Sequence, residues 1–376
     1  MKSTEEQSLK LFSHERLLLA ILADSVKGEA GISVSLMTEW KDAWEKLADM
    51  AERHGVSSVV ADFMEIVPKE VLPPKLILLT LIGQKMEQES VYQRQWDIAS
   101  QFADELNKKG VKVFVLKGIA FSTYYRNPAM RECGDCDCYL LRNNGEKAYA
   151  LGNETAQEMG WEAAFGTYKH SHIHADGLMI ENHRYLTDFN NTAQGKRIER
   201  LLEDVIKNED GTRIGDSQLV RPCAHFNALF LIKHALQDFI EGGLSLRMVY
   251  DWLAFLHAEQ NNLDWNRLYG DMEQCRLRRF ADIMTVVCRD YLGLQFTTDD
   301  INPRCDKEMV EAVLKDTLRG GSHLIPNESF AHKTVRILKR FMRMWKYRTL
   351  ATESVPVMIW NSFAFSSYLK RDIDME

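Results

Sequence analysis

Residues 111–141, VKVFVLKGIAFSTYYRNPAMRECGDCDCYLL, decide the fold of this chain. The stretch begins with an apolar run of strand length that ends at Lys117-Gly118, and it closes with a second strand-like segment that carries Asp135 and Asp137. Successive side chains of a strand alternate between its two faces. The two aspartates therefore share one face, and the cysteines that alternate with them point to the other.

Two carboxylates on one rigid face predict a divalent metal site. Their backbones lie about 6–7 Å apart along a strand, so both side chains can converge on one or two ions. Without a cation they would repel each other and lower stability. Hard cations such as Mg²⁺ take oxygen ligands and bridge substrate phosphates. We therefore expect Asp135 and Asp137 to bind Mg²⁺ or Mn²⁺.

The Lys117-Gly118 turn is the expected phosphate site. A strand, a glycine turn and a helix N-terminus direct backbone N–H groups toward one point, which suits a phosphate, and residues 119–125 can form such a helix. Lys117 adds a point charge. Glycine also occurs at strand-to-helix turns for backbone reasons alone. The Gly-Asp-x-Asp that follows 16 residues later favours the phosphate interpretation.

A third carboxylate comes from residues 177–183, GLMIENH, which are typical of another strand. Glu181 and His183 share one face of it. If this strand lies beside the one that carries Asp135, Glu181 completes a three-carboxylate cluster. The alternative is an exposed glutamate on an edge strand, since glutamate is mostly exposed. The upstream motif favours the ligand interpretation.

These motifs resemble a known family. LKG, then a loop with Tyr124, Tyr125, Pro128 and Arg131, then GDCDCYL resemble the polymerase-β-like nucleotidyltransferase superfamily, and more narrowly the bacterial family called uncharacterised nucleotidyltransferase. HSHIHADGLMIENHRYL is similar to that family's histidine-containing strand pair, and LFLIKHALQDFIEGGLSLRMVYDWLAFL to its C-terminal helical stretch. The likeness covers residues 40–260.

The resemblance implies an α+β protein with a small mixed sheet at its core. It implies transfer of a nucleoside monophosphate from an NTP such as ATP to a hydroxyl on a small molecule, protein or RNA, with release of pyrophosphate. The metal-binding and catalytic roles fall on Asp135, Asp137 and Glu181. The nucleotide contacts fall on Lys117, Gly118, Ser122, Arg131 and His183.

One departure from the wider superfamily leaves a second function open. That superfamily commonly has Gly-Ser or Gly-Gly at the turn, whereas this chain has Lys117-Gly118-Ile119 and no hydroxyl before Ser122. An NTP-binding module that regulates or scaffolds a partner is therefore an alternative. A protein that binds RNA or an anionic surface through the basic amphipathic segment 332–348 is another. The simpler interpretation of that segment is a solvated helix packed on its own domain.

Bulk properties limit the remaining classes of function. The 376 residues carry a net charge of −7, which argues against a protein that coats nucleic acid without specificity. Seven cysteines, an odd number without disulfide-like spacing, predict a reducing cytoplasm. The polar N-terminus does not fit a signal peptide, and no apolar run reaches the roughly 18 residues of a spanning helix.

Helical periodicity frames the strand-rich centre on both sides. We expect an N-terminal helical region over residues 1–88, a nucleotidyltransferase-like core over 89–190 and a C-terminal helical region over 191–376. The asparagine- and glycine-containing segment 208–215 is typical of a connector with a tight turn.

Two groups of possible metal ligands lie outside the main motif. His170, His172 and His174 alternate, so they line one face of a strand and could bind zinc, although half-buried histidines without a ligand are the simpler interpretation. Cys133, Cys136 and Cys138 form CxxCxC. Alternation directs the last two into the core, which disfavours a thiolate site.

Three polar residues of the C-terminal stretch allow two interpretations. Arg247 and Asp251 are four residues apart on an expected helix, where the order Arg-then-Asp is the less favourable one for a surface pair. A plain ion pair is the simpler interpretation, and a role in bracing the site or binding nucleotide is the alternative. We expect His234 to be a core or interface histidine rather than a base.

Overall fold

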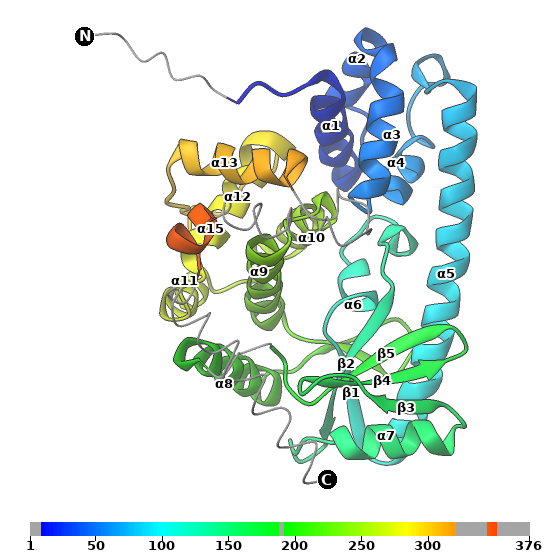
Figure 1. Cartoon of the computed structure of the whole chain (residues 1–376), viewed down its shortest axis with the longest axis vertical. Helices are drawn as coiled ribbons and strands as arrows, with labels where there is room; N and C mark the ends of the chain where they lie inside the picture. The colour runs from blue at the N-terminus through cyan, green and yellow to red at the C-terminus, as the bar shows by residue number, and fades with distance from the viewer. Residues whose placement is uncertain (1–8, 188–191, 321–343, 352–376) are drawn as a thin grey trace, which may run out of the picture.

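The computed structural model describes residues 9–187, 192–320 and 344–351. Within them, helices surround one mixed β-sheet (Figure 1), which confirms the expected α+β class. None of the helices in these ranges combines the length and apolar content that a bilayer crossing needs.

The sheet has the strand order β3-β4-β5-β2-β1-β7-β6. Strand β2 lies at its centre, antiparallel to β1 and parallel to β5. The register pairs Asp137 with Glu181. The strands are β1 (Val111–Val115), β2 (Asp135–Arg142), β3 (Glu162–Phe165), β4 (His170–Ala175), β5 (Leu178–His183), β6 (Thr212–Arg213) and β7 (Leu219–Arg221).

The helices form three groups. Those before the sheet are α1 (Ser13–Lys27), α2 (Ile32–Glu39), α3 (Trp44–Arg53), α4 (Ser57–Phe63) and α5 (Lys75–Lys108), with 3₁₀ turns η1 (Lys41–Ala43) and η2 (Lys69–Val71). Those among the strands are α6 (Ile119–Ser122), η3 (Pro128–Met130), α7 (Tyr149–Glu158) and α8 (Ala193–Asn208). Those after it are α9 (Ala224–Glu241), α10 (Leu246–Glu259), α11 (Trp265–Gln274), α12 (Arg278–Leu292), α13 (Lys307–Arg319) and α15 (Met344–Thr349).

The alternation of β2 assigns its two faces to two different hydrophobic cores. Cys136 and Cys138 are 1 % exposed and pack with residues of α5 and α7. Tyr139 and Leu141 belong to the other core, which includes residues of α8 and α9. The aspartates therefore face the C-terminal helices, and the thiols lie in the apolar interior, as the alternation predicts.

Helix α5 connects the N-terminal helices to the sheet. It is one continuous helix of 34 residues, about 51 Å long at 1.5 Å per residue, and it passes through residue 88. Two glutamine amides on it hold the loop before β2: Gln88 donates to the carbonyl of Ala129 (3.0 Å), and Gln95 donates to that of Cys133 (2.9 Å). The division into three regions stays a prediction.

Two features of the C-terminal half differ from the expectation of helices alone. Strand β7 pairs in parallel with β1, and β6 pairs with β7, because these two- and three-residue strands are too short to show alternation. Of the basic segment 332–348, residues 332–343 lie outside the described residues. In α15, Lys346 is buried, pairs with Asp316 and donates to the carbonyl of Phe239 (3.0 Å).

Candidate active site

The β1–α6 turn brings the chain against the start of β2. Gly118 has φ +51°, a region that favours glycine, and a Cβ there would lie 3.3 Å from the carbonyl oxygen of Asp135. Helix α6 is shorter than expected, with four residues. The hydroxyl of Ser122 donates to the carbonyl of Ile119 at 2.7 Å, so the structure does not bring this residue to the site.

A buried chain of charges begins at Lys117. Its ammonium lies 3.0 Å from Asp137 Oδ2, and His183 Nε2 lies 3.0 Å from Asp137 Oδ1. Burial alone would raise the pKa of the fully buried Asp137 carboxyl, but Lys117 and His183 outweigh it and hold the pKa well below its usual range. Burial likewise would lower the pKa of Lys117, whereas Asp137 and Asp135 raise it. Both groups are therefore charged.

His183 is held in its cationic form by acceptors on both ring nitrogens. Nδ1 lies 3.0 Å from the carbonyl of Tyr185, and Nε2 faces Asp137 and Glu181 at 3.0 and 3.4 Å. A carbonyl and a carboxylate each require a donor. Burial would lower the pKa of His183, but the two carboxylates raise it.

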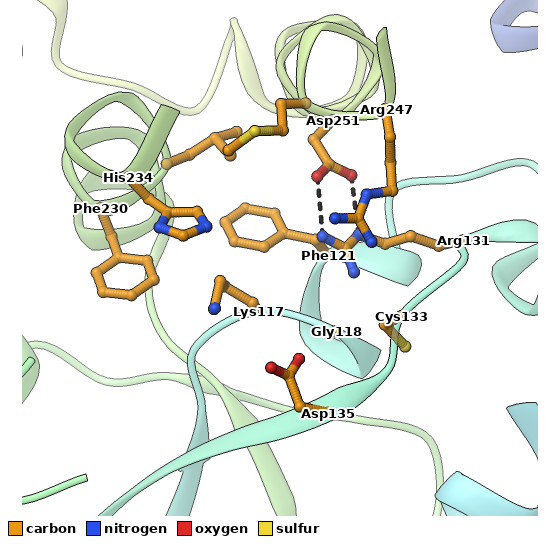
Figure 2. Close-up of a pocket in the computed structure, with 12 residues that line it drawn as sticks. Lys117, Gly118, Phe121, Arg131, Cys133, Asp135, Phe230, His234, Arg247 and Asp251 are labelled. Atoms are coloured by element: carbon orange, nitrogen blue, oxygen red, sulfur yellow. Dashed lines mark hydrogen bonds and ion pairs between the residues drawn. The ribbon is translucent and has the colours of Figure 1, made fainter. Parts of the chain in front are cut away.

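Asp135 lies beside these charged groups, and among the residues that the structure describes it forms no ion pair. Burial, and next the charge of Asp137, raise its pKa. It points into the pocket described below (Figure 2). A carboxyl with a raised pKa holds a proton more readily than its neighbour, which suits general-base chemistry.

Glu181 is surrounded by imidazoles. Its carboxylate lies 3.3 Å from His170 Nδ1, 4.0 Å from His172 Nε2 and 3.4 Å from His183 Nε2. Strand β5 lies between β4 and β2, and the Glu181 side chain is 14 % exposed, so the edge-strand alternative is wrong. Burial lowers the pKa of His170 to about 4 against the opposing charge of Glu181. His174, the third of the row, is exposed.

A cavity of about 40 Å³ lies between the sheet and helices α9 and α10. Figure 2 shows Lys117 and Asp135 on its sheet side, with His234 and Arg247 on the helices opposite. The lining residues are Lys117, Gly118, Phe121, Arg131, Cys133, Asp135, Phe230, Leu231, His234, Arg247, Met248 and Asp251. His234 is half-buried at this cavity, an interface position rather than a core one.

Arg131 and Asp251 form a buried ion pair beside the cavity. Arg131 Nε and Nη2 each donate to one Asp251 oxygen at 2.8 Å, and the Tyr125 hydroxyl donates to Oδ1 at 2.8 Å. The simpler expectation, a pair between Arg247 and Asp251, is wrong, because Asp251 is taken by Arg131. Arg247 donates instead to the carbonyl of Glu132 and lines the cavity.

Sequence reasoning missed the helix side of this cavity. Phe230 of α9 and Met248 of α10 line it, and the simpler expectation for Arg247 was an ion pair. The residues of α9 and α10 recur at helical spacing, which is the same pattern as a buried core face. Periodicity therefore could not separate cavity-lining residues from core residues here.

The comparisons with known proteins concern the part of the chain that carries this geometry. A family model described as uncharacterised nucleotidyltransferase matches residues 41–293. The chain belongs to this family. The match extends past the expected residue 260 to the end of α12. It includes every residue that lines the cavity and the charged residues Lys117, Asp137, Glu181 and His183. No curated protein and no solved structure gives a match.

Proposed function

We propose that this member of the nucleotidyltransferase family is a metal-dependent enzyme that moves a nucleoside monophosphate from an NTP to an acceptor hydroxyl and releases pyrophosphate. One observation carries the proposal: Asp135 and Asp137 share a face of β2, with Glu181 opposite Asp137 on the paired strand, next to a cavity lined by Lys117 and Arg247.

The three carboxylates fit Mg²⁺ or Mn²⁺. Their oxygens are the ligands that hard cations prefer, and the buried Asp137 Oδ2 already faces one cation, the Lys117 ammonium at 3.0 Å. When bound, such an ion supplies charge neutralisation for the phosphates and positions the reacting oxygens. Asp135, Asp137 and Glu181 are the residues that would hold it.

The chain's own cations and bases account for the rest of the reaction. The Lys117 ammonium and the Arg247 guanidinium face the cavity and suit phosphate oxygens. The acceptor oxygen forms a bond to the α-phosphorus, the bond from that phosphorus to the bridging oxygen breaks, and pyrophosphate leaves. Asp135, with its raised pKa, is the carboxylate suited to take the hydroxyl proton.

The test uses purified protein, α-labelled NTPs with Mg²⁺ or Mn²⁺, and a cell extract as the source of acceptor. We expect label in an acceptor and an equal release of pyrophosphate, both lost in Asp135→Asn and Asp137→Asn. Near wild-type turnover by either variant would contradict the assignment. Seven free thiols support a reducing compartment such as the cytoplasm for this activity.

A second candidate is an NTP-binding module that regulates a partner. It is favoured by one observation: Lys117 and His183 already pair with Asp137, so this carboxylate is neutralised within the chain. Calorimetric titration with each NTP, read together with pyrophosphate release, separates the two functions. A binding module binds the nucleotide without releasing pyrophosphate.

A further inference from the structure

We propose that Glu181 and the imidazoles around it form a binding site for a transition-metal ion of the Zn²⁺ class. The ligands are His170 of β4 and Glu181 and His183 of β5, with His172 next to them. The Nε2 proton of His183 is released to solvent when the ion binds, because a ligating imidazole is neutral. The proposal goes beyond nucleotidyl transfer and does not rest on it, because it concerns binding of the ion alone. Glu181 is shared with the proposed Mg²⁺ cluster, and the new assignment covers its histidine side.

The spacing of the ligand atoms matches a single tetrahedral ion. The ligand atoms of His170, Glu181 and His183 all lie within 4.8 Å of one another. Glu181 Oε2 is 3.3 Å from His170 Nδ1 and 3.4 Å from His183 Nε2. Two atoms bonded to one tetrahedral Zn²⁺ at about 2.0–2.1 Å are about 3.3–3.4 Å apart. Two of the three distances therefore already match the spacing around one such ion, and the ligand atoms of the two histidines lie within 4.8 Å of each other.

The hydrogen bonding of His170 gives a further reason to place a ligand here. His170 is 8 % exposed, and its buried Nδ1 makes no hydrogen bond within the part of the chain that the structure describes, although the Glu181 carboxylate is 3.3 Å away. Buried polar groups in folded proteins are nearly always hydrogen-bonded. An imidazole nitrogen and a carboxylate that face each other without a hydrogen bond have the arrangement of two ligands of one metal ion.

The donor types select the class of ion. Imidazole suits Zn²⁺, Ni²⁺, Cu²⁺ and Fe²⁺, whereas Mg²⁺ and Ca²⁺ are bound by oxygen. His172 Nε2, 4.0 Å from Glu181 Oε1, is the nearest further imidazole to this carboxylate. The site thus has an oxygen-rich end at Asp135 and Asp137 and a nitrogen-rich end at Glu181.

The row of histidines supplies its own control. His174 follows His172 on β4, but its register partner is Met179 rather than Glu181, and its side chain is exposed. It has the same chemistry and lies on the same strand, without the carboxylate. A metal held by exposed histidines in general would depend on His174 as much as on His170.

The test is a titration of untagged, nucleotide-free protein with Co²⁺, followed by its visible ligand-field absorption, with Zn²⁺ as competitor. We expect equimolar Co²⁺ to bind, Zn²⁺ to displace it, and excess Mg²⁺ to leave it bound. His170→Ala and Glu181→Gln should weaken binding at least about 10- to 100-fold, the loss seen when even the supporting shell of a metal site is changed. His174→Ala should bind as the wild type does.

Three controls make the result decisive. His183→Ala removes a buried hydrogen bond to Asp137, so melting curves accompany it, and His170→Ala carries the test if that variant does not fold. Asp135→Asn should keep Co²⁺ binding while losing nucleotidyl transfer, which separates this proposal from the proposed function. Absence of Co²⁺ binding by the wild type, or equal affinity in His170→Ala and His174→Ala, would overturn the assignment.

Discussion

The buried pair of Arg131 and Asp251 gives the sharpest prediction for stability. Arg131 is 5 % and Asp251 2 % exposed, and they are joined by two hydrogen bonds of 2.8 Å. Asp251→Ala leaves a guanidinium buried without its counter-charge. Breaking a buried pair in this way costs about 3–5 kcal/mol, which raises the unfolding constant roughly 100- to 5,000-fold at about 1.4 kcal/mol per tenfold.

A double-mutant cycle separates the cost of an unpaired buried charge from the net contribution of the ion pair to stability. The cycle combines Asp251→Ala with Arg131→Met. The double variant lacks both charges, so we expect it to lose far less stability than the two single variants together, mainly the roughly 1 kcal/mol of the Tyr125 hydrogen bond. The exposed pair of Arg53 and Asp49 is the control, with a loss of at most about 1 kcal/mol in Asp49→Ala.

Urea denaturation followed by tryptophan fluorescence measures each variant of the cycle. Losses in the two single variants that simply add, or a loss in Asp251→Ala no larger than that in Asp49→Ala, would refute the reasoning. The first result would mean that the two charges do not depend on each other. The second would mean that the pair is solvated.

Three further predictions follow from charge and backbone. Asp135→Asn should raise the melting temperature, because burial and Asp137 disfavour the charge of Asp135. Asp137→Asn should lower the melting temperature, because it removes a carboxylate that is paired with cations. Shifts of equal sign in thermal scans of the two variants would contradict this. Gly118→Val should lose stability and NTP binding together, since its positive φ strains any L side chain and a Cβ would lie 3.3 Å from the carbonyl oxygen of Asp135; calorimetric binding equal to wild type would disprove the phosphate turn. Burial alone would raise the pKa of Asp62, but hydrogen bonds from Asn127 and Lys85 outweigh it and lower that pKa. The stability that Asp62 contributes is therefore present above its unfolded pKa of about 3.8 and is lost as the pH falls through its lower folded pKa. An acid-denaturation midpoint that is unchanged in Asp62→Asn would refute this.

Local alternation was enough to predict the sheet side of the site. The spacing of Asp135 and Asp137 places both on one face, and the same rule places Glu181 and His183 together. Alternation left open whether the two strands pair, and the structure places β5 beside β2. The family resemblance added the chemistry expected of that face.

Contacts between distant segments were beyond sequence reasoning. Arg131 meets Asp251 across 120 positions, and no local pattern couples them. The expectation that Lys117 meets phosphate stays a prediction, and the contact between its ammonium and Asp137 was not expected. Ser122 was expected to contact nucleotide, but its hydroxyl donates a hydrogen bond to the carbonyl of Ile119. Each outcome depends on competition between partners that only the folded chain brings together.

The two glutamines of α5 have a mechanical consequence. Gln88 and Gln95 hold the carbonyls of residues 129 and 133 to one rigid helix, and the chain reaches Asp135 only two residues later. The N-terminal half of α5 packs against α4, far from the sheet (Figure 1). A tilt of α5 at its N-terminal end would therefore be transmitted through these two hydrogen bonds to the Asp135 carboxylate. A partner that binds the N-terminal helices would in this way change the position of Asp135.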